Sequence, residues 1–292
     1  MPSKRRTELL PIVALLATAF FWGLLWYPMR WLAAHGVPGL WGTGILFGSA
    51  FIVGSPLLWR YRAQLAARPA LLLGLMVTNG WCNTAFILAV LDGQVVRVLL
   101  LFYLSPVWAV LLARVLLSER MPSLAWFTLV LAMGGALTIL WQPSLGIPWP
   151  RDHSDWLAIS SGLGFALSNV FVRMSQDLAI GLKVVVAWLG VTVLSGLLLL
   201  GGAGGLVEWS LTPVMVAIVL GMVGIVMMSV CLMYGVSRMP VHRSAVILLF
   251  EVLVGAVSAQ WLAHEALGLR EWLGGLLILG AAWLASRQQL YD

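Results

Sequence analysis

The sequence contains few charged residues, cysteines or histidines. Only 10% of its 292 residues are Asp, Glu, Lys or Arg, whereas a soluble domain carries about 25%. The two cysteines, Cys82 and Cys231, both fall inside apolar stretches, so we expect neither a disulfide framework nor a cysteine metal site. The four histidines are scattered in or near predicted loops, without a nucleophile–base or metal constellation around them. We therefore expect neither an enzyme nor a bound cofactor.

Apolar residues are abundant instead, and they occur in runs of helix length. They make up 61% of the chain. A transmembrane helix needs about 20 consecutive apolar residues, whereas the strands of a membrane barrel have ~10 and alternate in polarity. We therefore predict an all-α membrane protein with ten transmembrane helices and short connections. The predicted ranges are 12–34, 39–59, 70–91, 95–117, 124–141, 155–176, 182–200, 212–235, 241–263 and 270–287.

The placement of positive charge predicts the orientation of these helices. If the N-terminus is cytoplasmic, all but four of the 17 Lys and Arg residues lie on the cytoplasmic side. The four on the other side are Arg30, Arg97, Arg151 and Arg270. Cytoplasmic loops of membrane proteins carry such an excess of Lys and Arg. We therefore expect both termini in the cytoplasm, and we attribute the net charge of +6 to topology rather than to nucleic-acid binding.

The chain contains a weak internal repeat. A shift of 146 residues places residues 95–137 on residues 241–283, with Arg97 on Arg243 and Glu119 on Glu265. A shift of 143 residues places the first predicted helix on the sixth. We predict two five-helix repeats, residues 1–147 and 148–292, joined by the proline-containing loop Gln142–Asp155. Because five is odd, the second repeat enters the membrane inverted. Inverted repeats are typical of alternating-access carriers, although channels and scramblases can also carry them.

Several predicted helices carry polar or aromatic side chains in midmembrane. Polar groups at that depth are costly unless they are paired or face a cavity. Trp22 and Trp26 share one helix face, as do Asn79 and Asn83. The structural alternatives are packing or lipid-facing aromatics, and amides that hydrogen-bond neighbouring helices. We predict a substrate cavity lined by Trp22, Trp26, Asn79, Asn83, Phe102, Tyr103, Ser105, Phe165, Asn169, Ser229, Ser244 and Glu251.

Two residues stand out in the fourth and ninth predicted helices, Pro106 and Glu251, and the repeat partner of Glu251 is Ser105, next to Pro106. Pro106 lacks an N–H and frees a carbonyl in the fourth, so we predict a hinge there. Glu251 is the only acidic residue in the middle of a predicted helix, which makes it a functional candidate. The alternative is a protonated or paired Glu with a structural role. Burial favours the neutral acid. Because no basic residue shares this depth, we favour facilitated transport over proton coupling.

Short motifs in both halves resemble the drug/metabolite transporter superfamily, specifically its ten-helix EamA type. The resemblance covers essentially the whole chain. It is carried by Phe21-Trp22-Gly23, by Leu104-Ser105-Pro106-Val107 followed by Glu119, and by Phe250-Glu251-Val252-Leu253 followed by Glu265, with glycine-rich runs closing each copy. Members of that family often have Glu-Pro where this chain has Glu251-Val252, so the resemblance does not by itself predict a kink in the ninth helix.

Within that superfamily, the tandem Trp22 and Trp26 look like those of the bacterial aromatic amino acid exporters. The resemblance implies a multi-pass protein of the bacterial inner (plasma) membrane that exports aromatic amino acids and related small amphiphilic metabolites by alternating access. The alternative is a multidrug or organic cation exporter with proton coupling through Glu251. The expected partners are a small-molecule substrate and the lipid bilayer, without nucleic acid, and homodimer formation stays open.

Overall fold

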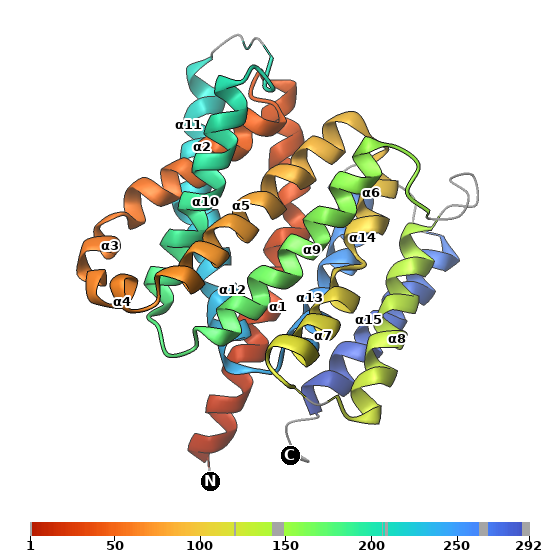
Figure 1. Cartoon of the computed structure of the whole chain (residues 1–292). Coiled ribbons are helices and arrows are strands. Elements are labelled where there is room, and N and C mark those ends of the chain that lie inside the picture. Colours follow the sequence, from red (N-terminus) through yellow and green to blue (C-terminus); the bar gives the residue numbers. More distant parts are fainter. Residues whose placement is uncertain are drawn as a thin grey trace.

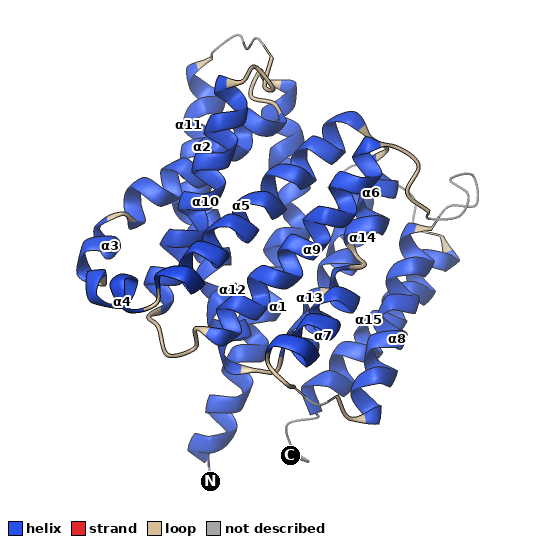
Figure 2. Ribbon diagram, viewed as in Figure 1, coloured by secondary structure: helices blue, strands red, loops and turns tan. Residues whose placement is uncertain are grey.

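The described part of the chain is built from helices alone (Figure 2). The computed structural model describes residues 2–119, 121–141, 149–205, 207, 210–262 and 268–287. The uninterrupted long helices are α1 (Pro2–Ala34), α2 (Gly39–Gly54), α5 (Pro69–Asp92), α8 (Ser123–Leu140), α9 (His153–Met174), α10 (Ile180–Leu200) and α15 (Leu269–Arg287). The short helices α3 (Pro56–Arg60) and α4 (Arg62–Ala67) lie between α2 and α5.

Three further apolar stretches form interrupted helices. The first is α6 (Val95–Phe102) with α7 (Ser105–Leu116), and the second is α13 (Val241–Leu248) with α14 (Phe250–Leu262). The third consists of α11 (Leu211–Val219), the π-helical turn η2 (Leu220–Ile225) and α12 (Val226–Arg238). Such irregular backbone at membrane depth is tolerated where protein buries it or where it lines a cavity.

Helices occupy all ten predicted ranges, which confirms the all-α membrane architecture. Eight stretches are long and apolar enough to cross a membrane. The predicted range 39–59 holds α2, a shorter apolar helix of 16 residues. The tenth predicted range holds α15, which begins with Leu269, Arg270 and Glu271 and is not among those eight. The number of ten membrane crossings therefore stays a prediction. Glu265 and the predicted boundary between residues 147 and 148 lie outside the described residues.

Helices of the two predicted repeats pack against each other in matching pairs. In the first half α1 packs against α12 and α14, and in the second half α9 packs in the corresponding way against α5 and against α6 and α7. Other contacts between the halves join equivalent helices, namely α2 with α10, α7 with α13 and α8 with α15. In addition, α10 packs against α5 in the way that α2 packs against η2 and α11. Figure 1 shows α8 and α15 side by side at one edge, and it shows α1 beginning and α15 ending at the same end of the bundle.

Glycine allows several helices to approach each other closely. A Cβ on Gly135 of α8 would lie 2.6 Å from the carbonyl oxygen of Gly274, and a Cβ on Gly274 would lie 2.6 Å from that of Gly135. Small residues let membrane helices come this close. The outer surface, in contrast, exposes large apolar side chains such as Val115, Leu200 and Trp261. An apolar exterior of this extent suits contact with lipid.

Candidate functional site

Two of the three interrupted helices, α6 with α7 and α13 with α14, break at equivalent positions of the repeat. The chain leaves the α-helix at Tyr103 and Leu104 between α6 and α7, and at Leu249 between α13 and α14. A shift of 146 residues takes Tyr103 to Leu249. After the first break Pro106 cannot donate a backbone hydrogen bond, and Val107 and Trp108 both donate to the Leu104 carbonyl, at 3.0 and 3.2 Å. After the second, Val252 donates to the Leu249 carbonyl at 3.1 Å.

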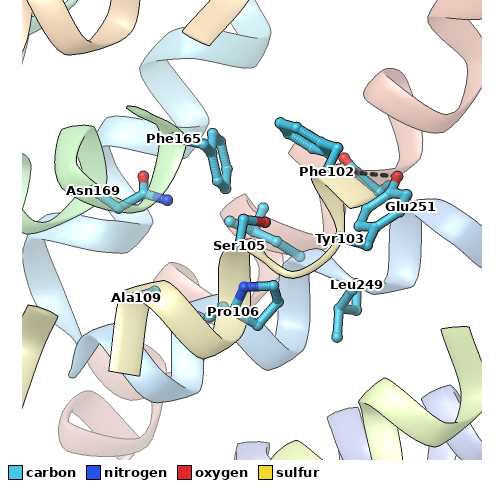
Figure 3. Close-up of a pocket in the computed structure, with 11 residues that line it drawn as sticks. Phe102, Tyr103, Ser105, Pro106, Ala109, Phe165, Asn169, Leu249 and Glu251 are labelled. Carbon is cyan, nitrogen blue, oxygen red and sulfur yellow. Dashed lines mark hydrogen bonds between the residues drawn. The ribbon is translucent and has the colours of Figure 1, made fainter. Parts of the chain in front are cut away.

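A pocket lies between the two breaks and the middle of α9 (Figure 3). We refer to it as the central pocket. It is lined by Phe102, Tyr103, Ser105, Pro106, Ala109, Phe165, Asn169, Ala245, Leu248, Leu249 and Glu251. Phe165 and Asn169 point into it together because positions i and i+4 share one helix face. Helix α9 approaches the first break closely, since a Cβ on Gly162 would lie 2.7 Å from the Phe102 carbonyl oxygen.

One wall of the central pocket is aromatic. The ring centroids of Phe102 and Phe165 are 5.8 Å apart, and those of Phe102 and Tyr103 are 5.5 Å apart. Phe86 of α5 extends this wall, with its ring centroid 5.0 Å from that of Phe102 in an edge-to-face arrangement. Aromatic pairs of this geometry are favourable beyond the area that they bury. The wall offers ring faces and edges to an apolar or aromatic group in the pocket.

The polar groups of the central pocket come from both repeats. The Tyr103 hydroxyl donates to Glu251 Oε1 at 2.7 Å, which joins the two breaks directly. Asn169 is only 4% exposed and Ser105 only 3%. Among the residues that the structure describes, neither the Asn169 amide nor the Ser105 hydroxyl has a hydrogen-bond partner. Buried polar groups normally have one, so these two are available to a bound molecule.

The central pocket is small in this conformation. Its volume of about 10 Å³ is close to the space that one water molecule requires. A substrate larger than water can therefore enter only when the helices around the pocket move apart.

Seven of the predicted cavity and hinge residues line this pocket, and six lie elsewhere. Trp26 Nε1 donates to Ser258 Oγ of α14 at 2.9 Å. Asn79 Nδ2 donates to Ser168 Oγ of α9 at 3.2 Å, and Asn83 Nδ2 donates to the Asn79 carbonyl at 2.9 Å. The Trp26 and Asn79 contacts join neighbouring helices, as in the structural alternative, whereas the Asn83 contact lies within α5.

The other three predicted residues also lie outside the lining of the central pocket. Trp188 Nε1 of α10 donates to Ser229 Oγ at 2.9 Å, so this hydroxyl joins α10 to α12. Ser244 is 1% exposed, and its hydroxyl donates to the Val241 carbonyl within α13 at 2.9 Å. Trp22 on α1 is partly exposed. Its neighbour Gly23 lies against α14, where a Cβ would come within 2.7 Å of the Glu251 carbonyl oxygen.

Two charged clusters lie at opposite ends of α9 and join residues of the two predicted repeats. The first, which we call the Arg97 cluster, contains Arg97 of α6, Asp155 of α9 and the Trp149 carbonyl. Arg97 Nε lies 2.9 and 2.8 Å from the two Asp155 oxygens, Nη2 lies 2.8 Å from Oδ2, and Nη2 also donates to the Trp149 carbonyl. The Arg97 and Asp155 side chains are 7% and 1% exposed. This is a bidentate, buried ion pair.

The start of α9 prepares the Arg97 cluster. Asp152 is the N-cap of α9 and accepts a hydrogen bond from the Asp155 N–H at 2.9 Å. The Ser154 hydroxyl, followed by the Asp155 N–H, holds the pKa of the Asp152 carboxyl below its usual value. The cap therefore fixes the first turn from which the Asp155 side chain reaches Arg97.

The second group, which we call the Glu119 cluster, follows the end of α7 and contains Glu119, Arg173 and the start of α13. Glu119 Oε1 accepts from Arg173 Nε at 3.4 Å, and Oε2 accepts from the Val241 N–H at 3.0 Å. His242 Nδ1 lies 4.0 Å from Oε2. The Arg173 and Glu119 side chains are 23% and 17% exposed, more than those of the Arg97 cluster. This cluster connects the predicted repeats by a more open set of contacts.

The sequence interpretation did not identify four pocket residues or the pairing within the clusters. Ala109, Ala245, Leu248 and Leu249 line the pocket but have no polar group that would mark them. With cytoplasmic termini, Arg97 and the loop Gln142–Asp155 lie on the same side of the membrane. The signal in the sequence that could have predicted the pairing of Arg97 with Asp155 is that the two residues carry opposite charges and lie at the same membrane depth.

Comparisons with known proteins agree with this arrangement. Residues 9–141 and residues 153–287 each match the model of the EamA-like transporter family. A solved structure described only as the crystal structure of a protein superposes with a TM-score of 0.78 over 97% of this chain and 98% of its own, at 16% identity. At that identity the likeness shows the fold alone.

Two relatives are also named as transporters. An uncharacterized transporter of Pseudomonas aeruginosa is 26% identical over 180 residues, which are 58% of this chain and 56% of that relative. An uncharacterized transporter of Archaeoglobus fulgidus is 27% identical over 223 residues, which are 74% of this chain and 76% of that relative. The match thus spans little more than half the length of the first relative.

Proposed function

Because the chain belongs to the EamA-like transporter family, we propose that it exports aromatic amino acids and related small amphiphilic metabolites across the bacterial inner membrane. We further propose facilitated transport by alternating access, with the central pocket as the substrate site. The single observation that carries this proposal is a pocket that combines an aromatic wall with unpaired, buried polar groups between two interrupted helices.

The chemistry of the pocket supports a substrate with one ring and one polar end. Phe102 and Phe165 offer ring contacts, and the Asn169 amide can both donate and accept hydrogen bonds. Glu251 supplies a carboxyl group at the second break. In inverted-repeat transporters, substrates bind near the midplane beside discontinuous helices whose ends supply unpaired backbone groups. An amino acid with an aromatic side chain can place its ring against the aromatic wall and its amino and carboxyl groups against the polar residues of this pocket.

Alternating access is supported by the size of the pocket. With a volume of about 10 Å³, it is too small to hold an amino acid until the surrounding helices move apart. The matching contacts of α1 with α14 and of α9 with α7 provide two equivalent surfaces along which the halves can separate in turn.

Counterflow of labelled tryptophan in liposomes tests this function. Asn169→Ala should raise the KM for tryptophan about tenfold, because one hydrogen bond in a buried site contributes about 1 kcal/mol or slightly more. Asn83→Ala is the matched control, since that amide lies outside the lining of the central pocket and bonds within α5. Equal KM values for the two variants, or a wild-type protein that exchanges no aromatic amino acid, would contradict the proposal.

A second candidate function is proton-coupled export of organic cations. The observation that favours it is Glu251, a carboxyl group in the central pocket beside aromatic rings. Rings and a carboxylate together attract a quaternary amine. If this function holds, wild-type flux of a quaternary amine rises with an imposed pH gradient and Glu251→Gln abolishes the response. Under facilitated export, flux persists in Glu251→Gln and is insensitive to the gradient, and Glu271→Gln at the exposed start of α15 is the control.

A further inference from the structure

A second pocket lies on the outside of the bundle, where α7 ends and α8 begins. It is lined by Val110, Leu111, Ala113, Arg114, Glu119, Met121, Trp126 and His242, and we call it the α7–α8 groove. Its volume is about 40 Å³, larger than that of the central pocket. It therefore has room for a small polar group in this conformation.

Arg114 is the unusual residue of the groove. It lies in the last turn of α7, within the membrane-crossing stretch Val95–Leu116, and its side chain is exposed. The guanidinium group has no hydrogen-bond or ion-pair partner among the residues that the structure describes. A charged side chain near the end of a membrane helix extends toward the interface, where lipid headgroups lie. Arginine binds phosphate through parallel N–H donors.

The surface around the groove exposes apolar side chains, which can contact lipid acyl chains. Leu111 is 45% exposed and Val115 is 76% exposed on α7, and Phe127 is 56% exposed on α8. A phosphate ester that reaches Arg114 from this surface must therefore be attached to an apolar body. A membrane phospholipid meets that requirement, whereas a water-soluble phosphate does not.

The other polar groups of the groove select the kind of headgroup. Glu119 contributes a carboxylate to the same groove as Arg114, and Trp126, 42% exposed, contributes an indole ring. Arg173 Nε and the Val241 N–H donate to that carboxylate, and His242 Nδ1 lies 4.0 Å from it. A carboxylate accepts about four hydrogen bonds. An ammonium group in the headgroup is attracted by both the carboxylate and the ring. A headgroup that carries another negative charge besides its phosphate is repelled by Glu119.

We propose that the α7–α8 groove binds the headgroup of an aminophospholipid, with the phosphate on Arg114 and the primary ammonium group between Glu119 and Trp126. The site is separate from the central pocket, with which it shares no lining residue. Because Glu119 also belongs to the Glu119 cluster, a bound headgroup adds a contact to residues that join the two predicted repeats.

Native mass spectrometry of the purified protein tests this site with phosphatidylethanolamine, phosphatidylglycerol and phosphatidylcholine of identical acyl chains. The wild type should retain phosphatidylethanolamine most tightly. Arg114→Gln should weaken that retention about tenfold or more, because it removes a charge-assisted hydrogen bond. Arg62→Gln, a change at another exposed arginine outside the groove, should leave retention unchanged.

Two further results decide the assignment of the headgroup. Trp126→Leu should lower the preference for phosphatidylethanolamine over phosphatidylglycerol several-fold while the protein stays folded, since this ring is partly exposed. The proposal is overturned if Arg114→Gln and Arg62→Gln retain phosphatidylethanolamine equally. It is also overturned if the wild type prefers phosphatidylglycerol, or if soluble phosphoethanolamine displaces the lipid at equal concentration.

Discussion

The Arg97 cluster and the Glu119 cluster join the predicted repeats at opposite ends of α9, but they differ in burial and geometry. The Arg97–Asp155 pair is bidentate, and its side chains are 7% and 1% exposed. The Glu119–Arg173 pair is a single contact of 3.4 Å between side chains 17% and 23% exposed. Separating a buried ion pair leaves uncompensated charge away from water, whereas a partly exposed pair regains solvation.

This difference indicates which end of the bundle opens more readily. The helices around the central pocket have to separate before a substrate can enter, and separation at the Glu119 cluster disrupts fewer desolvated contacts. Under the proposed alternating access, we therefore expect the transport cycle to begin with opening at that end. Under the predicted topology, it is the cytoplasmic end, from which an exporter takes its substrate.

The largest expected effect follows from breaking the Arg97 cluster. Asp155→Asn removes the negative charge and leaves Arg97 buried, which should lower the free energy of unfolding by about 3–5 kcal/mol. Thermal unfolding in detergent would measure this loss. Asp177→Asn is the matched control, because the Asp177–Arg68 pair is about half exposed and such pairs contribute about 0–1 kcal/mol. Similar losses in the two variants would contradict the assigned difference between the clusters.

An intermediate effect is expected at the Glu119 cluster. Glu119→Gln should cost about 1 kcal/mol or less in stability, but it should increase the population open at that end roughly fivefold. A cysteine at Ala245, a buried residue that lines the central pocket, reports this opening by its reaction rate with a thiol reagent. The chain's own cysteines are replaced by alanine in this experiment. Unchanged labelling in Glu119→Gln relative to Glu271→Gln would contradict the expected opening.

The smallest effect on stability is expected from two cysteine variants that assign each cluster to a side of the membrane. Ala34 ends α1 and Ala63 lies in α4, and both are exposed. With cytoplasmic termini, an impermeant thiol reagent applied to intact cells should label Ala34→Cys and not Ala63→Cys. Neither change should alter stability noticeably. The opposite labelling would reverse the topology and place the Glu119 cluster outside.

Helix positions were predictable because apolar runs of membrane length leave the backbone little choice other than hydrogen bonding to itself as a helix. The break after Phe102 was predictable for a local reason, the missing N–H of Pro106. The break at Leu249 was not, because Val252 has an N–H and the local sequence permits a continuous helix. It occurs where α13 and α14 pack between α1, α7 and α15, so tertiary packing determines it.

The composition of the central pocket was only partly predictable for a related reason. Asn83 and Asn169 carry the same amide in midmembrane, yet Asn83 bonds to the Asn79 carbonyl and only Asn169 faces the pocket without a partner. Helical periodicity tells which residues share a face, but these helices are apolar on nearly every side. The sequence therefore holds no signal for which neighbour each face meets.

The sequence by itself determined the helical class, the membrane environment and the equivalence of residues 95–137 with residues 241–283. These depend on composition, run length and spacing, which are local or additive along the chain. Only the tertiary structure decided that the Tyr103 hydroxyl meets Glu251, that Arg97 meets Asp155, and that Asn169 has no partner. Each of these results from the distance between helices far apart in sequence, and that distance is set by the packing of all helices together.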